Sequence, residues 1–196
     1  GVDTGRGHTD GAPQQRRAPD PMDKHYLTPL FAPESIIVFC GSPDDPAGQT
    51  AQAQALRQAL STQRYSGSLQ YLDIHDTGTL ADLAQARADL AIIALPPKDV
   101  AAALEVAGRM TCRSALVISS GIDAEQAAEL KKIARREGVF LLGPNCLGMQ
   151  RPKLQLNASA TGPMARAGSL ALVSQSGALT TSMLDWASNN AVGFSS

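Results

Sequence analysis

Cys146 is the residue whose sequence context most resembles that of a catalytic nucleophile. It lies in "FLLGPNCLGM", where an apolar run stops at Gly143-Pro144 and is followed by Asn145 and Cys146 in a loop. A nucleophilic cysteine needs a base or a cationic neighbour that lowers its pKa, and the sequence identifies no such partner. We therefore expect residues 143–145 to form a shaped turn that lines a groove, with Cys146 near its end, and we assign no catalytic residue.

The three histidines, His8, His25 and His75, do not indicate a reaction centre either. None has metal-ligand spacing to a cysteine or a carboxylate, and no Ser-His-Asp arrangement is supported. His75 follows a strand-like run and is expected to be a solvated loop residue. We therefore assign no metal site.

The turn "CGSPDDPAGQT" offers groups that bind anions. It lacks the G-x-G-x-x-G dinucleotide fingerprint, but a Gly-Ser turn that leads into a helix N-terminus presents backbone N–H groups and a hydroxyl to a phosphate. Asp44 and Asp45 do not favour phosphate, so an anion site and a plain turn are both open from these residues alone. The candidate ligand-binding residues here are Cys40, Gly41, Ser42, Pro43 and Gly48.

A second such turn lies in "LVSQSGAL". Its residues Ser174, Gln175, Ser176 and Gly177 precede a helix-like segment, where they can cap the helix or receive an anion. Capping is the favoured interpretation.

These turns need a scaffold, and the chain alternates strand-like and helix-like segments from Pro33 onward. Short apolar runs, rich in β-branched residues, predict strands, and Gly and Pro separate them. This alternation predicts an α/β fold with a doubly wound parallel sheet. The expected strands cover residues 35–40, 69–74, 89–95, 114–120 and 139–142, and the expected helices cover about 49–63, 80–88, 98–110 and 124–137, the last with Asp123 as N-cap and Gly138 beyond its end.

In this fold, ligands bind outside the carboxyl ends of the strands. The third strand end carries Pro96-Pro97, which has no backbone N–H to offer and forms an apolar wall. The fourth carries Ser119-Ser120-Gly121, which offers hydroxyl and N–H groups. Each is by itself an ordinary turn, but together they describe a groove for an elongated ligand with phosphates at one end.

Composition narrows the class of protein. The chain has 196 residues, a formal net charge of −1 and a sequence pI of about 6.3, so nothing suggests binding to nucleic acid or to an anionic membrane. Three widely spaced cysteines argue against a disulfide framework and for a reduced, cytoplasmic protein. We see no secretory signal or membrane span.

The rest of the chain is less regular. Residues 1–27 are expected to be a disordered leader, a vector-derived remnant, or sequence upstream of a start at Met22. Residues 28–150 are expected to form the main domain and 151–168 an irregular linker. Residues 169–196 contain one strand, 169–174, and one helix, which we interpret as the truncated start of a second domain.

Five segments, in this order and spacing, resemble the CoA-binding region of the succinyl-CoA synthetase α-subunit superfamily, which includes the NDP-forming acyl-CoA synthetases. The segments are "SIIVFCGSPDDPAG", "ALPPKDV", "LVISSGI", "GPNCLGM" and "GSLALVSQSGAL". The resemblance implies a Rossmann-like CoA-binding domain followed by the first βα unit of a flavodoxin-like domain. The segments "LNAS" and "LDWA" are more similar to a bacterial lysine acetyltransferase branch with a synthetase-like region.

The resemblance also implies roles for individual residues. The first turn, Cys40 to Pro43, would bind the phosphates of CoA, and Asn145-Cys146 would lie near its thiol. Two departures weaken the match: Ser-Ser replaces Thr-Glu before Gly121, and no basic residue lies near Asp73–Asp76. The positions that correspond to the family's remaining CoA contacts are Pro96, Pro97, Ile118, Ser119 and Ser120.

No histidine here matches the phosphohistidine of true synthetases, so the chain is expected to bind CoA or acyl-CoA and to catalyse nothing alone. Its expected partners are the remaining domains of a parent synthetase or N-acetyltransferase, an ATP-grasp portion or an acetyltransferase domain; homo-oligomerisation is left open. Two alternatives remain: a regulatory module that senses CoA or mediates oligomerisation, and an NAD-binding domain. The incomplete glycine fingerprint counts against the latter.

Overall fold

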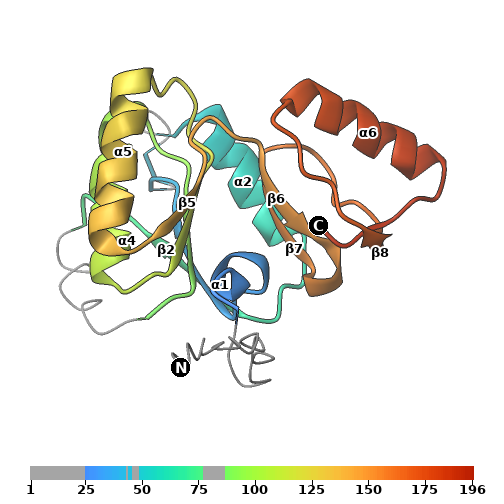
Figure 1. Cartoon of the computed structure of the whole chain (residues 1–196), viewed down its shortest axis with the longest axis horizontal. Coiled ribbons are helices and arrows are strands. Elements are labelled where there is room, and N and C mark those ends of the chain that lie inside the picture. Colours follow the sequence, from blue (N-terminus) through green and yellow to red (C-terminus); the bar gives the residue numbers. More distant parts are fainter. Residues whose placement is uncertain (1–24, 43, 46–48, 77–86) are drawn as a thin grey trace, which may run out of the picture.

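A five-stranded parallel sheet forms the centre of the computed structural model, which describes residues 25–42, 44–45, 49–76 and 87–196 (Figure 1). The strand order is β2-β1-β3-β4-β5, and every neighbouring pair is parallel. The doubly wound α/β fold is therefore confirmed. The strands are β1 (Ser35–Phe39), β2 (Ser68–Leu72), β3 (Leu90–Ile93), β4 (Ser114–Val117) and β5 (Phe140–Leu142).

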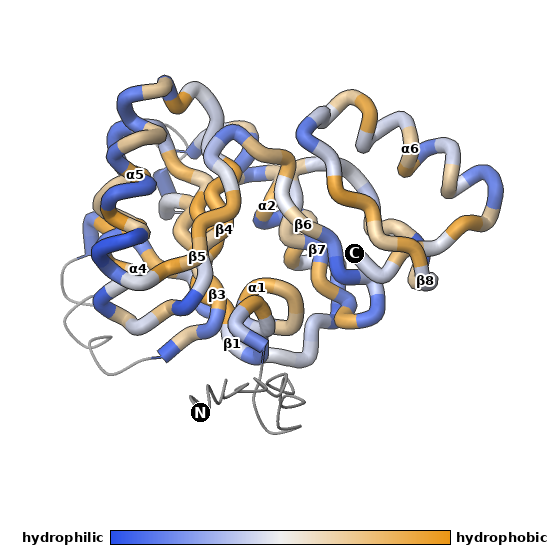
Figure 2. Tube along the Cα trace, in the orientation of Figure 1, coloured by the Kyte–Doolittle hydropathy of each residue, from blue (hydrophilic) through white to orange (hydrophobic). Residues whose placement is uncertain are grey.

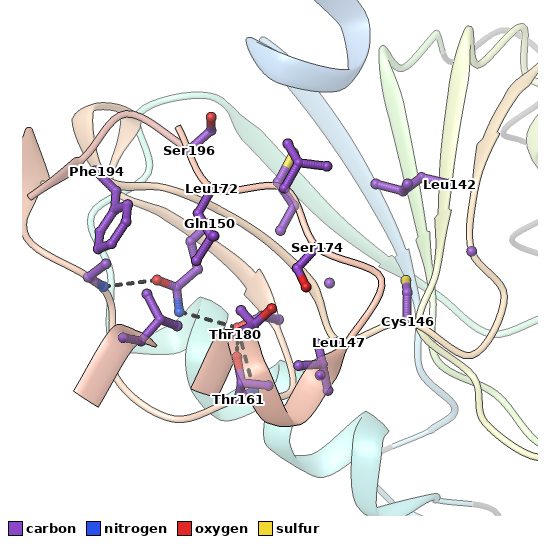
Figure 3. A pocket seen from close by; sticks show the side chains of 18 of the residues that line it. Leu142, Cys146, Leu147, Gln150, Thr161, Leu172, Ser174, Thr180, Phe194 and Ser196 are labelled. Atoms are coloured by element: carbon purple, nitrogen blue, oxygen red, sulfur yellow. Dashed lines mark hydrogen bonds between the residues drawn. The ribbon is translucent and has the colours of Figure 1, made fainter. Parts of the chain in front are cut away.

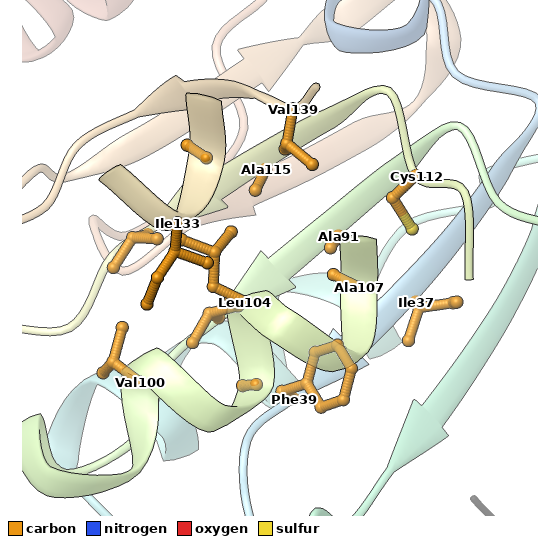
Figure 4. Close-up of a cluster of buried hydrophobic side chains, with 14 of the residues drawn as sticks. Ile37, Phe39, Ala91, Val100, Leu104, Ala107, Cys112, Ala115, Ile133 and Val139 are labelled. Carbon is orange, nitrogen blue, oxygen red and sulfur yellow. The ribbon is translucent and has the colours of Figure 1, made fainter. Parts of the chain in front are cut away.

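The central strands are apolar on both faces because both faces are covered. Along β1, Ile37 and Phe39 join one buried cluster and Ile36 and Val38 join another, as the two-residue period of a strand requires. Figure 2 shows the strands of the sheet in hydrophobic colours and hydrophilic stretches on the outer helices. Figure 4 shows the first cluster, in which Val100, Leu104 and Ile133 from the helices meet the strands.

Helices α4 (Pro97–Arg109) and α5 (Ala124–Glu137) cover this first face and pack on each other (Figure 1). The predicted ends of α5 are confirmed. The Asp123 side chain accepts a hydrogen bond from the Gln126 backbone N–H at 2.8 Å, and the Gln126 Oε1 accepts one from the Asp123 backbone N–H at 3.1 Å. Gly138 ends the helix in a left-handed conformation. This reciprocal pair satisfies two N–H groups that the helix itself leaves unpaired.

The second face is covered by α2 (Ala51–Ser61), the short α1 (Thr28–Phe31) and an antiparallel hairpin, β6 (Gly148–Arg151) with β7 (Leu156–Ser159). The hairpin differs from the irregular linker expected at 151–168. All four residues of β7 are buried, and Asn157 and Ser159 are paired with each other at 2.6 Å. Since "LNAS" carries two polar residues that the fold buries, its apolar pattern is too weak to predict a strand. The division into domains stays a prediction.

The C-terminal unit consists of β8 (Ala167–Leu170) and α6 (Gly177–Asn189), which lie beyond the hairpin in Figure 1. The strand expected at 169–174 starts earlier and ends at Leu170. Its bridges in the described part of the chain are to Phe194, and Val173 is 90% exposed. The Leu172 N–H still donates to the Ser196 carbonyl at 2.9 Å, but this contact does not extend the strand to residue 174.

Several expectations lie outside the described residues: the leader up to residue 24, most of the helix expected at 80–88, and the candidate residues Pro43 and Gly48. Within the described ranges, no helix combines the length and apolar composition that a membrane crossing requires. All three cysteines are free.

Candidate functional site

The site is built on the edge of the sheet where the carboxyl ends of the strands meet. Phe39 at the end of β1 lies beside Leu72 of β2 and Ile93 of β3. The chain passes from β1 to β2 on one side and then returns to place β3 on the other, so the strand order reverses between β1 and β3. A doubly wound sheet opens a crevice at such a point and binds its ligand there.

The turn after β1 is shaped by Gly41 and Ser42. Gly41 has φ 71°, a left-handed conformation that favours glycine. The Ser42 hydroxyl accepts a hydrogen bond from the Asp44 N–H at 3.2 Å, and its carbonyl accepts one from Gln49 Nε2 at 2.7 Å. Helix α2 begins directly afterwards, with Thr50 as N-cap. The turn therefore holds Gly41 and Ser42 near a helix N-terminus, where an anion is favoured.

Arg57 also belongs to this turn, and the sequence analysis missed it. From the second turn of α2, its Nη2 donates to the Gly41 carbonyl at 3.0 Å and contacts the Cys40 Sγ at 3.1 Å. Its guanidinium lies 4.6 Å from the ring centroid of Tyr71 on β2. The only signal in the sequence is its helical spacing, because Arg57 follows the buried Leu56 and precedes the buried Leu60 by three residues. No strand-end motif contains it.

Ser119, which was predicted to bind the ligand, joins the ends of β3 and β4. Ser119 is buried beside Ile118, and its hydroxyl accepts a hydrogen bond from the Leu95 N–H at 2.9 Å, so it supports the edge from beneath. Ser120 is exposed, and its hydroxyl lies 2.5 Å from Gln52 Nε2 of α2. Pro96 and Pro97 are partly exposed at the start of α4, as an apolar wall requires.

The loop after β5 is fastened to the loop after β4 by Asn145. Its side-chain amide accepts from the Ile122 N–H at 3.2 Å and donates to the Ile122 carbonyl at 2.9 Å, while its own N–H donates to the Ser119 carbonyl at 3.1 Å. Gly121 and Asn145 both have positive φ, 77° and 56°. In the structure, the side-chain amide of Asn145 holds the two loops together. Its predicted contact with the ligand stays a prediction.

Cys146 has the environment of a structural thiol. Its Sγ donates to the Val117 carbonyl at 3.3 Å. Burial raises the pKa of the thiol, and backbone hydrogen bonds from Gly148 and Cys146 oppose that shift only in part. A raised pKa keeps the thiol protonated, whereas a nucleophile needs the thiolate. No contact between His75 and Cys146 supports a catalytic pair, because the His75 Nε2 lies 3.9 Å from the Asp99 Oδ2.

A cavity of about 600 Å³ lies between the loop after β5 and the C-terminal unit. Figure 3 shows Cys146 and Leu142 on one side of it and Ser174, Leu172 and Thr180 on the other. Leu147 packs against the start of α6, because a Cβ on Gly177 would lie 3.0 Å from a Leu147 methyl carbon. The cavity therefore opens beside Asn145 and Cys146, where the thiol end of the ligand is expected.

The second predicted turn lies at the rim of this cavity and caps α6. The Ser176 hydroxyl accepts from the Leu179 N–H at 3.3 Å, and the Ser174 hydroxyl accepts from the Ser176 N–H at 3.0 Å. The predicted capping is confirmed for Ser176, and an anion at this turn stays a prediction. The cavity is lined by Ser174, Gln175 and Gly177, and the residues around Gly41 do not line it. In the described part of the chain, no three His, Cys, Asp or Glu residues come together as metal ligands do.

A known family matches the part of the chain that contains the ends of β2 to β5, but not the turn after β1. The family described as "CoA binding domain" matches residues 68–152. The ADP-forming acetate–CoA ligase I of Archaeoglobus fulgidus is 34% identical over 174 residues, which cover 85% of this chain and 25% of that protein. The α subunit of the ADP-forming acetate–CoA ligase I of Pyrococcus furiosus is 36% identical over 114 residues, 55% of this chain and 24% of the subunit.

Solved structures agree with the fold. The dinucleotide-forming acetyl-coenzyme A synthetase 1 of Ca. Korarchaeum cryptofilum, in complex with phosphate and ADP, superposes with a TM-score of 0.72 at 25% identity, over 86% of this chain and 38% of that one. The chain thus spans about a quarter of the length of these curated relatives. It contains a CoA-binding domain homologous to the N-terminal module of the NDP-forming acyl-CoA synthetases.

Proposed function

We propose that this chain binds CoA, free or acylated, in an extended conformation along the carboxyl edge of its sheet. The observation that carries the proposal is the convergence of the loops after β1, β3, β4 and β5 at that edge. These loops bring together groups that suit different parts of one long ligand, and the relatives act on CoA, as their names state.

The diphosphate is placed at Gly41 and Ser42, where a turn with positive φ leads into the N-terminus of α2. The apolar Pro96-Pro97 wall and the exposed Ser120-Gly121 rim suit the pantetheine arm, which alternates methylene groups with amides. The thiol or thioester is placed beside Asn145 and Cys146, at the mouth of the cavity. Because that cavity provides room beyond the thiol, acyl-CoA is included among the ligands. The other positions assigned to this proposed site are Cys40, Pro43, Gly48, Ile118 and Ser119.

For the whole protein we propose an NDP-forming acyl-CoA synthetase, in which this chain is the CoA-binding module and further domains supply the nucleotide chemistry. The support is the coverage: the matched ligases are about four times as long as the region aligned to them. The turn 174–177 at the cavity rim is proposed as an anion site that operates with those domains. The acetyltransferase parent and the cytoplasmic location stay predictions from the sequence.

Isothermal titration with CoA and acetyl-CoA tests the proposal. We expect saturable heat for the wild-type chain and none for Gly41→Val, because a branched side chain would strain the left-handed turn and block the approach of a phosphate to the backbone. Gly162→Val is the matched control. Gly162 also has positive φ, 66°, but it follows β7 of the hairpin and not a strand of the parallel sheet, and no atom lies within 4 Å of the position of an added Cβ. Absence of heat for either ligand with the wild-type chain at high protein concentration would refute the proposal.

A further inference from the structure

Arg57 holds a positive charge at the binding edge that the described fold does not neutralise. It forms no ion pair with a carboxylate in the described ranges, where Arg136, by contrast, pairs with both Glu105 and Glu137 at 2.8 Å. Its Nε is buried and has no hydrogen-bond partner there. A buried, unsatisfied guanidinium N–H costs free energy, so the fold keeps Arg57 at this position without pairing it fully.

The position of Arg57 identifies which part of the ligand it faces. One end of its guanidinium donates to Gly41 in the turn after β1, and its plane lies over Tyr71. Tyr71 pairs with Val38 one residue before the end of β1. In doubly wound domains, the turn after the first strand holds the diphosphate and the end of the second strand lies beside the ribose. Arg57 therefore spans from the diphosphate position to the ribose position.

Among the described residues, the side chains next to Arg57 do not neutralise its charge. Tyr71 is 39% exposed and presents an aromatic face to the guanidinium, which orients an arginine without consuming its donors. The Asp73 carboxylate, next after β2, accepts a hydrogen bond from the His75 N–H at 2.9 Å, so it is engaged in its own turn. On the other side of the turn, Ser42 is followed by the exposed Asp44 and Asp45. Their negative charges lower the affinity of the turn for an anion.

We propose that Arg57, oriented by Tyr71, is the residue that recognises the 3′-phosphate on the ribose of CoA and makes the site select CoA over its dephosphorylated form. This assignment rests on the proposed CoA-binding function. The fork of an arginine matches the geometry of a phosphate monoester. The absence of a basic residue at Asp73–Asp76 is then compensated by a cation supplied from helix α2.

Titration of the wild-type chain with CoA and with 3′-dephospho-CoA gives the first test. A charge-assisted contact predicts that CoA binds about 10- to 100-fold more tightly. Arg57→Gln is expected to lower the affinity for CoA to that for dephospho-CoA and to leave the latter unchanged. Arg57→Lys, which keeps the charge but loses the fork, should retain part of the preference. Arg135→Gln, an exposed arginine on α5, is the matched control and should change neither affinity.

The outcomes separate this proposal from the proposed function. Equal affinity of the wild-type chain for both ligands overturns the assignment of Arg57 while CoA binding stands. A parallel loss of both affinities in Arg57→Gln also overturns it, because Arg57 would then only shape the turn through Gly41. If the wild-type chain binds neither ligand, both proposals fall. Should Arg57→Gln not fold, the wild-type comparison and competition by adenosine 3′,5′-bisphosphate against AMP still decide the question.

Discussion

Substitution of Gly143 by any residue with a side chain would force the backbone to move. The loop after β5 passes so close to β4 that a Cβ at this position would lie 2.2 Å from the Val117 carbonyl oxygen, and φ is 95°. The same carbonyl accepts the Cys146 thiol. The shape of the loop that holds Asn145 and Cys146 therefore depends on one glycine.

Gly143→Ala is expected to lower the free energy of unfolding by about 3 kcal/mol or more, since backbone strain and a steric clash both apply. Gly138→Ala is the matched control: φ is 69° there, but a Cβ would meet nothing within 4 Å. It should cost only the strain, about 1 kcal/mol. Urea denaturation of the two variants measures the difference, and equal losses would show that Val117 does not restrict the loop.

Cys146→Ser is expected to leave the affinity for CoA nearly unchanged, because the thiol contacts a backbone carbonyl and not a reacting group. Burial raises the pKa of Cys146, so the protonated form persists to higher pH than in a free thiol. Alkylation of Cys146, followed by peptide mass spectrometry, should be slow at pH 7 and should accelerate only above the ordinary thiol pKa of about 8.5. Rapid alkylation at pH 7, or a large loss of affinity in the serine variant, would contradict this interpretation.

At the scale of elements, the sequence predicts best what local chemistry determines. The ends of α5 follow from Asp123 and Gly138, and the parallel strands follow from apolar runs stopped by Gly or Pro. The strand-end residues around Gly41 and Asn145 were found for the same reason. What local pattern cannot supply is a contact made across the fold. Arg57 sits in an ordinary helix and reaches the site only because the fold places it beside Gly41 and Tyr71. Asn157 is buried where Ser159 and Gly162 form hydrogen bonds with its side chain.

Asp123→Ala tests the contribution of the capping box of α5. It should lower the free energy of unfolding by about 1 kcal/mol, because the Gln126 N–H loses its acceptor. Glu129→Ala on the same helix removes only an exposed pair with Lys132 at 3.5 Å and should cost a few tenths of a kcal/mol, about the value for such pairs. Thermal or urea unfolding compares the two, and equal losses would show that the cap is not specific.

For the molecule as a whole, the hairpin β6–β7 is part of the main core rather than a connection to the next unit. Leu156 and Ala158 are fully buried and join the cluster that contains Leu56 of α2. Arg151 extends the same attachment, because its guanidinium donates to the carbonyls of Phe31 on α1 and Ser195. The predicted boundary at residue 150 therefore falls inside β6.

A chain that ends after Gln150 should lose cooperative unfolding, whereas one that ends after Arg166 should keep it. Removal of Leu156 alone deletes a buried side chain worth about 2–5 kcal/mol, a large part of the 5–15 kcal/mol that stabilises a typical domain. Circular dichroism melts and binding of an apolar dye measure the effect. A cooperative melt for the shorter chain would place the boundary at residue 150 after all.

The double hydrogen bond between Asn145 and Ile122 has a consequence for the speed of recognition. Two loops that would otherwise move separately are joined through one amide, and the left-handed turns at Gly121 and Asn145 leave each of them few alternative conformations. At these two loops, the ligand then needs no rearrangement before contact. Association should proceed in one step at the rate of productive encounters, and the lifetime of the complex, rather than its formation, would be the quantity that differs among CoA derivatives.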